Sequence, residues 1–294
     1  METADIIKRI RKIEITTRNL VNDLFSGEYH SLFKGQGLEF SEVREYQAGD
    51  SFKQIDWNVT ARHGYPYIKK FEETRELNVL FLVDGSASTL FGSRSFLKSE
   101  LITEITAVLS FSALSNNDKV GLLLFTDEVE KYIPPRKGRK SALRILRDIL
   151  YFEPKSVKTN IKIAVEYIYR LTKKHSIIFI ISDFQDENFE DSLKLLAKKH
   201  DVIALRILDK AEIDLPAAGI LHLHDPETGQ NLTVNSSSRS VREKYAQAIQ
   251  KQEKELKEKF RKMKIELVTL FTDEPYAPEL RKFFKFRIRM KNKR

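Results

Sequence analysis

The sequence of 294 residues contains no cysteine, which excludes disulfides, thiolate nucleophiles, cysteine-ligated zinc and iron–sulfur clusters. Long apolar runs are also absent. Stretches such as IIFII at 177–181 are far shorter than the roughly 20 residues that span a bilayer. The first residues, METADIIKRIRKIEI, lack the apolar core and small-residue cleavage site of a signal peptide. We therefore expect a cytoplasmic protein without a transmembrane segment.

Excess positive charge is missing from most of the chain. The net charge is +9, and residues 241–294 alone hold 17 Lys/Arg against 8 Asp/Glu, a surplus that equals the whole. The rest of the chain is therefore neutral overall. This distribution weakens any argument from total charge that the entire protein binds nucleic acid.

Regular alternation of strands and helices begins at about residue 77. Apolar segments rich in Ile, Val and Leu alternate with amphipathic segments, which is typical of a mostly parallel sheet covered by helices on both faces. We therefore predict an α/β fold. The predicted strands are 78–84, 119–126, 176–183, 201–208 and 265–271, and the predicted helices are 94–115, 139–152, 160–173, 189–199 and 239–263.

Two domains are expected. Residues 1–76 hold a predicted amphipathic helix over 5–25 and a segment that mixes aromatic residues, glycines and charges, read as a β-rich subdomain. Residues 77–294 form the α/β domain, with a hairpin inserted at 219–234 and a basic C-terminal segment.

Oxygen-bearing side chains follow the ends of the predicted strands. Asp84, Ser86 and Ser88 come directly after strand 78–84, Asp183 ends strand 176–183, and Thr159 lies on the loop before helix 160–173. Ligands of such sheets gather outside the carboxyl ends of the strands. A set of oxygen ligands with two carboxylates suits a hard cation, Mg²⁺ first and Mn²⁺ or Ca²⁺ next.

The stretch Asp84-Gly85-Ser86-Ala87-Ser88 resembles the D-x-S-x-S signature of von Willebrand factor A-type domains. The resemblance implies a Rossmann-like sheet and a metal-ion-dependent adhesion site, which Thr159 and Asp183 would complete. It also implies that Asp183 acts through a water, which leaves the metal open to an Asp or Glu of a protein partner.

The preceding segment carries a second resemblance. G-x-G-x-E-F at 35–40, V-R-E-Y-x-x-G-D at 43–50 and I-D-W-N-x-x-A-R at 55–62 resemble the signature of a bacterial family named domain of unknown function fifty-eight. That family couples this segment to an A-type domain and is typically encoded beside a MoxR-type AAA+ ATPase. The resemblance implies a non-enzymatic interaction module that serves such an ATPase, or a client of it, as adaptor or co-chaperone.

Two other functions stay open. One is a Mg²⁺-dependent hydrolase or phosphatase at the same strand ends, although no histidine or lysine is predicted there to act as base. The other is binding of nucleic acid or of an anionic membrane through the tail RKFFKFRIRMKNKR. The alternative interpretation of this tail is that its phenylalanines pack on the core.

For two sets of residues a purely structural role is an alternative to the functional interpretation. Asp84 and Ser86 could serve only as turn and helix-capping groups. Arg44, Asp50, Asp56 and Arg62 are predicted to form a network of hydrogen bonds and ion pairs around the lone tryptophan, Trp57, in preference to contacting a partner.

Overall fold

The structure is a computed structural model that describes residues 13, 39–47, 49–52, 55–72, 76–93, 96–224 and 229–291. These residues divide into two compact units, with the division between Leu77 and Asn78. The helix predicted over 5–25 lies outside the described residues, apart from Ile13. The assignment of 1–76 and 77–294 as domains therefore stays a prediction.

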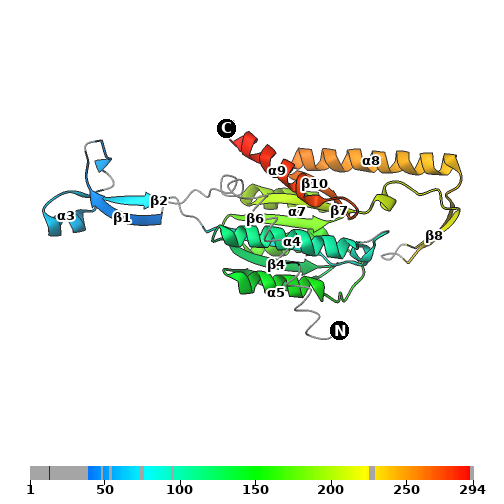
Figure 1. Cartoon of the computed structure of the whole chain (residues 1–294), viewed down its shortest axis with the longest axis horizontal. Coiled ribbons are helices and arrows are strands. Elements are labelled where there is room, and N and C mark those ends of the chain that lie inside the picture. Colours follow the sequence, from blue (N-terminus) through cyan, green and yellow to red (C-terminus); the bar gives the residue numbers. More distant parts are fainter. Residues whose placement is uncertain are drawn as a thin grey trace. The chain divides into compact units, whose positions relative to one another are not determined.

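The smaller unit is a hairpin with a short helix. Strand β1 (Glu39–Glu45) pairs antiparallel with β2 (Tyr67–Glu72), and helix α3 (Trp57–His63) lies between them in the chain (Figure 1). Asp56 begins α3 by accepting hydrogen bonds from the N–H groups of the second and third residues after it, and Gly64 ends it with a φ of 75°. The β-rich character of this segment is thus accompanied by a helix that the sequence pattern did not indicate.

The larger unit is built on a six-stranded sheet. Its strands, in chain order, are β3 (Asn78–Asp84), β4 (Lys119–Phe125), β5 (Val129–Arg136), β6 (Ser176–Ser182), β7 (Asp201–Leu208) and β10 (Glu266–Phe271). In space their order is β10-β7-β6-β3-β4-β5, and the edge strand β5 is antiparallel to β4 while the other neighbours are parallel (Figure 1).

Helices cover both faces of this sheet. On one face α4 (Lys98–Ser115) and α5 (Arg139–Leu150) pack on each other and on β3 and β4. On the other, α6 (Ile161–Leu171), α7 (Glu190–Lys199) and α8 (Arg239–Met263) bury a core with alternate strand residues such as Leu80 and Ile180. Helix α9 (Tyr276–Lys291) packs against β10. The predicted α/β fold with a mostly parallel sheet is confirmed.

A separate two-stranded hairpin, β8 (Ile220–His224) and β9 (Asn231–Asn235), follows β7 and precedes α8, where the sequence predicts it (Figure 1). The short 3₁₀ helices η2 (Ala87–Leu90) and η3 (Lys210–Glu212) follow β3 and β7. Both therefore lie at the carboxyl ends of their strands.

The strand order creates a switch point between β3 and β6. The chain leaves β3 toward β4 and leaves β6 toward β7, in opposite directions along the sheet. A crevice forms outside the carboxyl ends of two such strands, and ligands of doubly wound sheets bind there. The predicted cation ligands Asp84 and Asp183 stand at these two strand ends.

Candidate metal centre at the carboxyl ends of β3 and β6

Asp84 is a buried carboxylate that links the two strand ends. Its Oδ1 accepts a hydrogen bond of 2.9 Å from the backbone N–H of Ser86, and its Oδ2 accepts one of 2.7 Å from the hydroxyl of Ser182 in β6. The first bond is the turn role that the structural reading assigned to Asp84. The second ties the carboxylate across the switch point and fixes its orientation.

The hydroxyls of Ser86 and Ser88 lie 3.1 Å apart. Ser86 precedes η2, but its side chain makes no capping hydrogen bond to that helix. Ser86 thus occupies the capping position, where its carbonyl accepts from Thr89, but its hydroxyl does not cap the helix. The two hydroxyls stand together beside Asp84, as a shared cation would require.

Thr159 belongs to the loop between α5 and α6, which lies against the Asp84–Ser88 segment. The N–H of Ala87 donates to the carbonyl of Val157 at 3.1 Å, and Gly85 abuts the ring of Phe152. A Cβ placed on Gly85 would meet Phe152 Cε1 at 2.1 Å, so this close approach requires glycine. The structure thus brings the loop of Thr159 to the site.

Asp183 is buried beside Asp84 and is engaged by a cation of the protein itself. Its Oδ2 lies 3.2 Å from Nζ of Lys98, its Oδ1 accepts from the N–H of Gln185, and its carbonyl accepts from Nε of Arg206 at 3.0 Å. The same ammonium of Lys98 is 2.5 Å from Oε1 of Glu212. The carboxylates of Asp84 and Asp183 thus each accept two hydrogen bonds, and that of Asp183 accepts one of them from a charged group.

The sequence reading missed Lys98. No lysine was expected near the site, yet this one is 1% exposed and stands at the start of α4, in contact with Asp183. Its neighbours in the sequence, Leu97 before it and Ser99 after it, give no local signal that its side chain is buried. The ammonium already donates to two carboxylates, so it is poorly placed to accept a proton as a general base.

Electrostatics at the site favours an added positive charge. Burial and the charge of Asp183 raise the pKa of Asp84 to about 7, against the opposing hydrogen bonds from Ser86 and Ser182. Burial likewise raises the pKa of Glu212, although Lys98 opposes it. Two buried carboxylates that repel each other are the arrangement a divalent cation would relieve.

The donor chemistry fits a hard cation in part. Asp84, Ser86 and Ser88 present oxygens side by side, as Mg²⁺ prefers, with the remaining positions left to water. Among the described residues, no three carboxylate or histidine side chains gather as a conventional metal cluster. The five-residue ligand set of Asp84, Ser86, Ser88, Thr159 and Asp183 stays a prediction, with Asp183 the residue most committed elsewhere.

The network predicted around Trp57 is only partly present. Arg44 makes two hydrogen bonds to Asp50, of 2.9 and 2.7 Å, and Asp56 begins α3. Trp57, however, is 68% exposed, so these groups do not enclose it. The expectation of a tryptophan at the centre of that network is wrong, because most of the Trp57 side chain is exposed.

The basic C-terminal tail is a packed helix in its described part. Phe283 and Phe284 of α9 are buried, and Arg287 pairs with Asp201 at 2.6 Å and with Glu266 at 3.4 Å. Phe286 is exposed. The two buried rings are unavailable for stacking on bases, which favours the structural reading of this segment.

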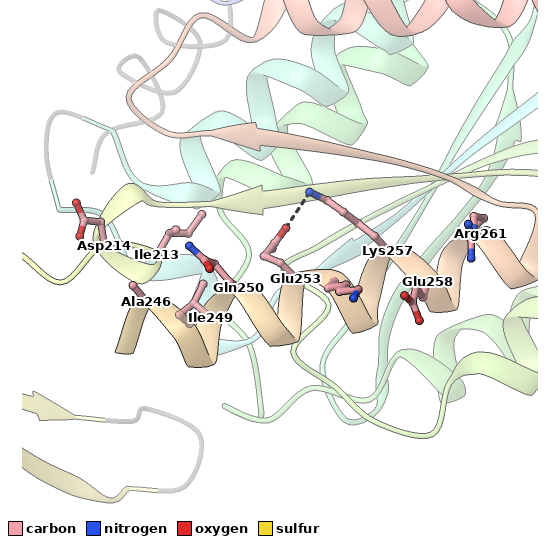
Figure 2. Close-up of a pocket in the computed structure, with 10 residues that line it drawn as sticks. Ile213, Asp214, Ala246, Ile249, Gln250, Glu253, Lys257, Glu258 and Arg261 are labelled. Atoms are coloured by element: carbon pink, nitrogen blue, oxygen red, sulfur yellow. Dashed lines mark ion pairs between the residues drawn. The ribbon is translucent and has the colours of Figure 1, made fainter. Parts of the chain in front are cut away.

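A groove runs along α8. It has a volume of about 690 Å³, and its lining side chains come from α8 and from Ile213 and Asp214 after η3 (Figure 2). Glu253 in this groove forms ion pairs with Lys257, at 3.4 Å, and with Arg206. The candidate ligands do not line it.

Comparisons with known proteins find similar sequences and structures. The uncharacterized protein Rv1480 of Mycobacterium tuberculosis is 28% identical over 283 residues, which cover 95% of this chain and 89% of that protein. The crystal structure of the conserved hypothetical protein BatB from Bacteroides thetaiotaomicron is similar at 19% identity and a TM-score of 0.47, over 74% of this chain and 100% of that one. The VWA domain of SpRpn10 matches at 11% identity and a TM-score of 0.39, over 70% and 94%.

Within the part of the chain that the structure describes, none of the helices combines the length and apolar character needed to cross a membrane. The model of the family described as "Protein of unknown function DUF58" matches residues 42–255, which take in strands β3, β4, β6 and β7 and the candidate ligands. The chain belongs to this DUF58 family.

Proposed function

We propose that this protein is a non-enzymatic, metal-ion-dependent interaction module. In this proposal Asp84, Ser86 and Ser88 hold a divalent cation, most readily Mg²⁺, with Thr159 and a water on Asp183 completing the site. The bound cation supplies an electrophilic position for an Asp or Glu carboxylate of a protein partner. The observation that carries the proposal is the pairing of the Ser86 and Ser88 hydroxyls beside the buried, oriented carboxylate of Asp84.

Other residues of the protein orient Asp84 and balance the charge of Asp183. Ser182 and the N–H of Ser86 hold the two oxygens of Asp84 in place before any cation arrives. Lys98 neutralises part of the charge of Asp183 and Glu212. In this proposal Asp183 orients the water that binds the cation. The positive charge of the cation is then less neutralised by the protein and can attract the carboxylate of the partner.

The proposed partner is a MoxR-type AAA+ ATPase or a client of it. The support is the family membership together with the resemblance that implies this gene neighbourhood. An adaptor role agrees with a site at which Lys98, the described amine in contact with Asp183, already pairs with Asp183 and Glu212.

The test is direct binding to a purified MoxR-type ATPase encoded in the same genome, measured by biolayer interferometry in Mg²⁺ and in chelator. Binding is expected in Mg²⁺ only and is expected to be lost in Asp84→Ala. Asp191→Ala, which removes an exposed carboxylate on α7, is the matched control and should bind like the wild type. Binding that survives both chelator and Asp84→Ala would rule out the metal-dependent mechanism.

Cation binding is measured separately by isothermal titration calorimetry. Mg²⁺ binding by the wild type, but not by Asp84→Ala, is expected. If Mg²⁺ binds and the ATPase does not, the site stands and the partner assignment fails.

A further inference from the structure

Large apolar side chains are exposed around the candidate metal centre. Leu90 and Phe91 end the segment that begins at Asp84, Phe96 and Leu97 precede α4, and Val157 lies on the loop of Thr159. Their exposed fractions run from 38% for Leu97 to 61% for Leu90. We call these five residues the apolar rim.

Backbone contacts hold the three segments of the rim together. The N–H of Ala87 donates to the carbonyl of Val157 at 3.1 Å, and the N–H of Lys98 donates to the carbonyl of Phe91 at 3.0 Å. A Cβ on Gly92 would meet the carbonyl oxygen of Phe96 at 2.5 Å, so these two segments are in close contact. The three segments that carry the rim are therefore adjacent to one another.

Scattered exposed apolar side chains are normal on a soluble protein, but a contiguous patch marks a contact surface. This patch is continuous with the segment that carries Ser86 and Ser88. Protein interfaces commonly surround one desolvated polar contact with apolar side chains that exclude water from it. The arrangement here has that form.

One exposed cation stands within the rim. Lys158 lies between Val157 and Thr159, whereas Lys155 on the same loop pairs with Glu128 and Glu130. An acidic partner segment is thus favoured over a basic one.

We propose that the rim and the metal centre form one docking surface for a protein segment in which an Asp or Glu is flanked by large apolar side chains. This inference rests on the proposed function, because the carboxylate is assigned to the cation. It adds the chemistry of the residues on either side of that carboxylate.

The experiment selects a random-peptide display library against the immobilised full chain in Mg²⁺, and measures the affinity of the selected peptides by fluorescence anisotropy. The expected peptides contain an acidic residue next to Leu, Ile, Phe or Met. Phe91→Ser and Leu90→Ser should each weaken their binding by about tenfold, which is the loss of one partly buried apolar side chain. Mg²⁺ affinity, measured by calorimetry, should be unchanged in both variants.

Leu195→Ser is the matched control, because Leu195 is a leucine of similar exposure (50%) on α7, outside the rim. It should bind the peptides like the wild type. Circular dichroism of all variants checks that each is folded.

Each other outcome overturns the inference in a distinguishable way. Mg²⁺-dependent peptides that tolerate both rim variants would refute the rim while the metal-dependent function stands. Peptides that need the rim but ignore chelator and Asp84→Ala would refute the combined surface and the proposed function together. Mg²⁺-dependent self-association in analytical ultracentrifugation would assign the surface to a second copy of this chain, and recovery of no metal-dependent peptide would also refute it.

Discussion

The ammonium of Lys98 lies 3.2 Å from Oδ2 of Asp183 and 2.5 Å from Oε1 of Glu212. This buried lysine joins the start of α4, the end of β6 and η3, three segments that meet at the carboxyl edge of the sheet. It supplies a positive charge to the buried Asp183 and the partly buried Glu212.

Replacing Lys98 with methionine keeps the length of the side chain but leaves Asp183 and Glu212 without their cation. Breaking a buried pair in this way costs about 3–5 kcal/mol, and we expect that loss in urea unfolding of K98M. Lys131→Met is the control, since Lys131 is partly exposed and its partner Asp148 still accepts from Arg147; its cost should stay below about 1 kcal/mol. A K98M variant as stable as wild type would show that the ion pair does not form.

Gly85 is expected to tolerate no larger residue. A Cβ at this position would lie 2.1 Å from Cε1 of Phe152, so Gly85→Ala must displace either the ligand segment or the loop that carries Thr159. We expect a loss of about 1–3 kcal/mol in thermal or urea unfolding, together with weaker Mg²⁺ binding. The same substitution in a Phe152→Ala background should cost little; an equal cost in both backgrounds would refute the steric explanation.

His200 should make the protein sensitive to acid. Burial, with the charges of Lys199 and His175, lowers the pKa of His200 from 6.5 to about 4. Between these two values the unfolded chain binds the proton more readily than the folded one. His200 therefore contributes fully to the free energy of unfolding above pH 6.5. As the pH falls toward 4, this contribution is lost, and the free energy of unfolding decreases by about 2–3 kcal/mol.

Urea unfolding over this pH range measures the effect. The slope of stability against pH should become shallower in His200→Phe and should be unaffected in His222→Phe, which replaces an exposed histidine of β8. An unchanged slope in His200→Phe would show that other groups cause the acid sensitivity.

Two neighbouring phenylalanines of α9 should behave oppositely. Phe284 is fully buried, so Phe284→Ala is expected to destabilise the fold by about 3–5 kcal/mol. Phe286 is 56% exposed, and Phe286→Ala should change stability by less than about 0.5 kcal/mol. Thermal unfolding distinguishes them, and equal effects would contradict the packing of this helix.

Most of the larger unit could be predicted from local patterns. Strands β3 and β7 and helix α8 begin and end at the predicted residues. The other strands and helices for which bounds were predicted differ by a few residues at most, since burial repeats along each segment with the period of its own geometry. The position of Asp84 and Asp183 at strand ends follows from the same pattern.

Contacts between residues far apart in the sequence could not be predicted from local patterns. Lys98 and Asp183 are 85 residues apart, and they meet because β3 and β6 are neighbours in the sheet while α4 begins at the same edge. The exposure of Trp57 and the opposite fates of Phe284 and Phe286 likewise depend on which face of a helix meets the rest of its unit. The sequence shows which residues are apolar and which are charged. Which residues contact one another depends on strand order and helix orientation, and these are set only when the whole core packs.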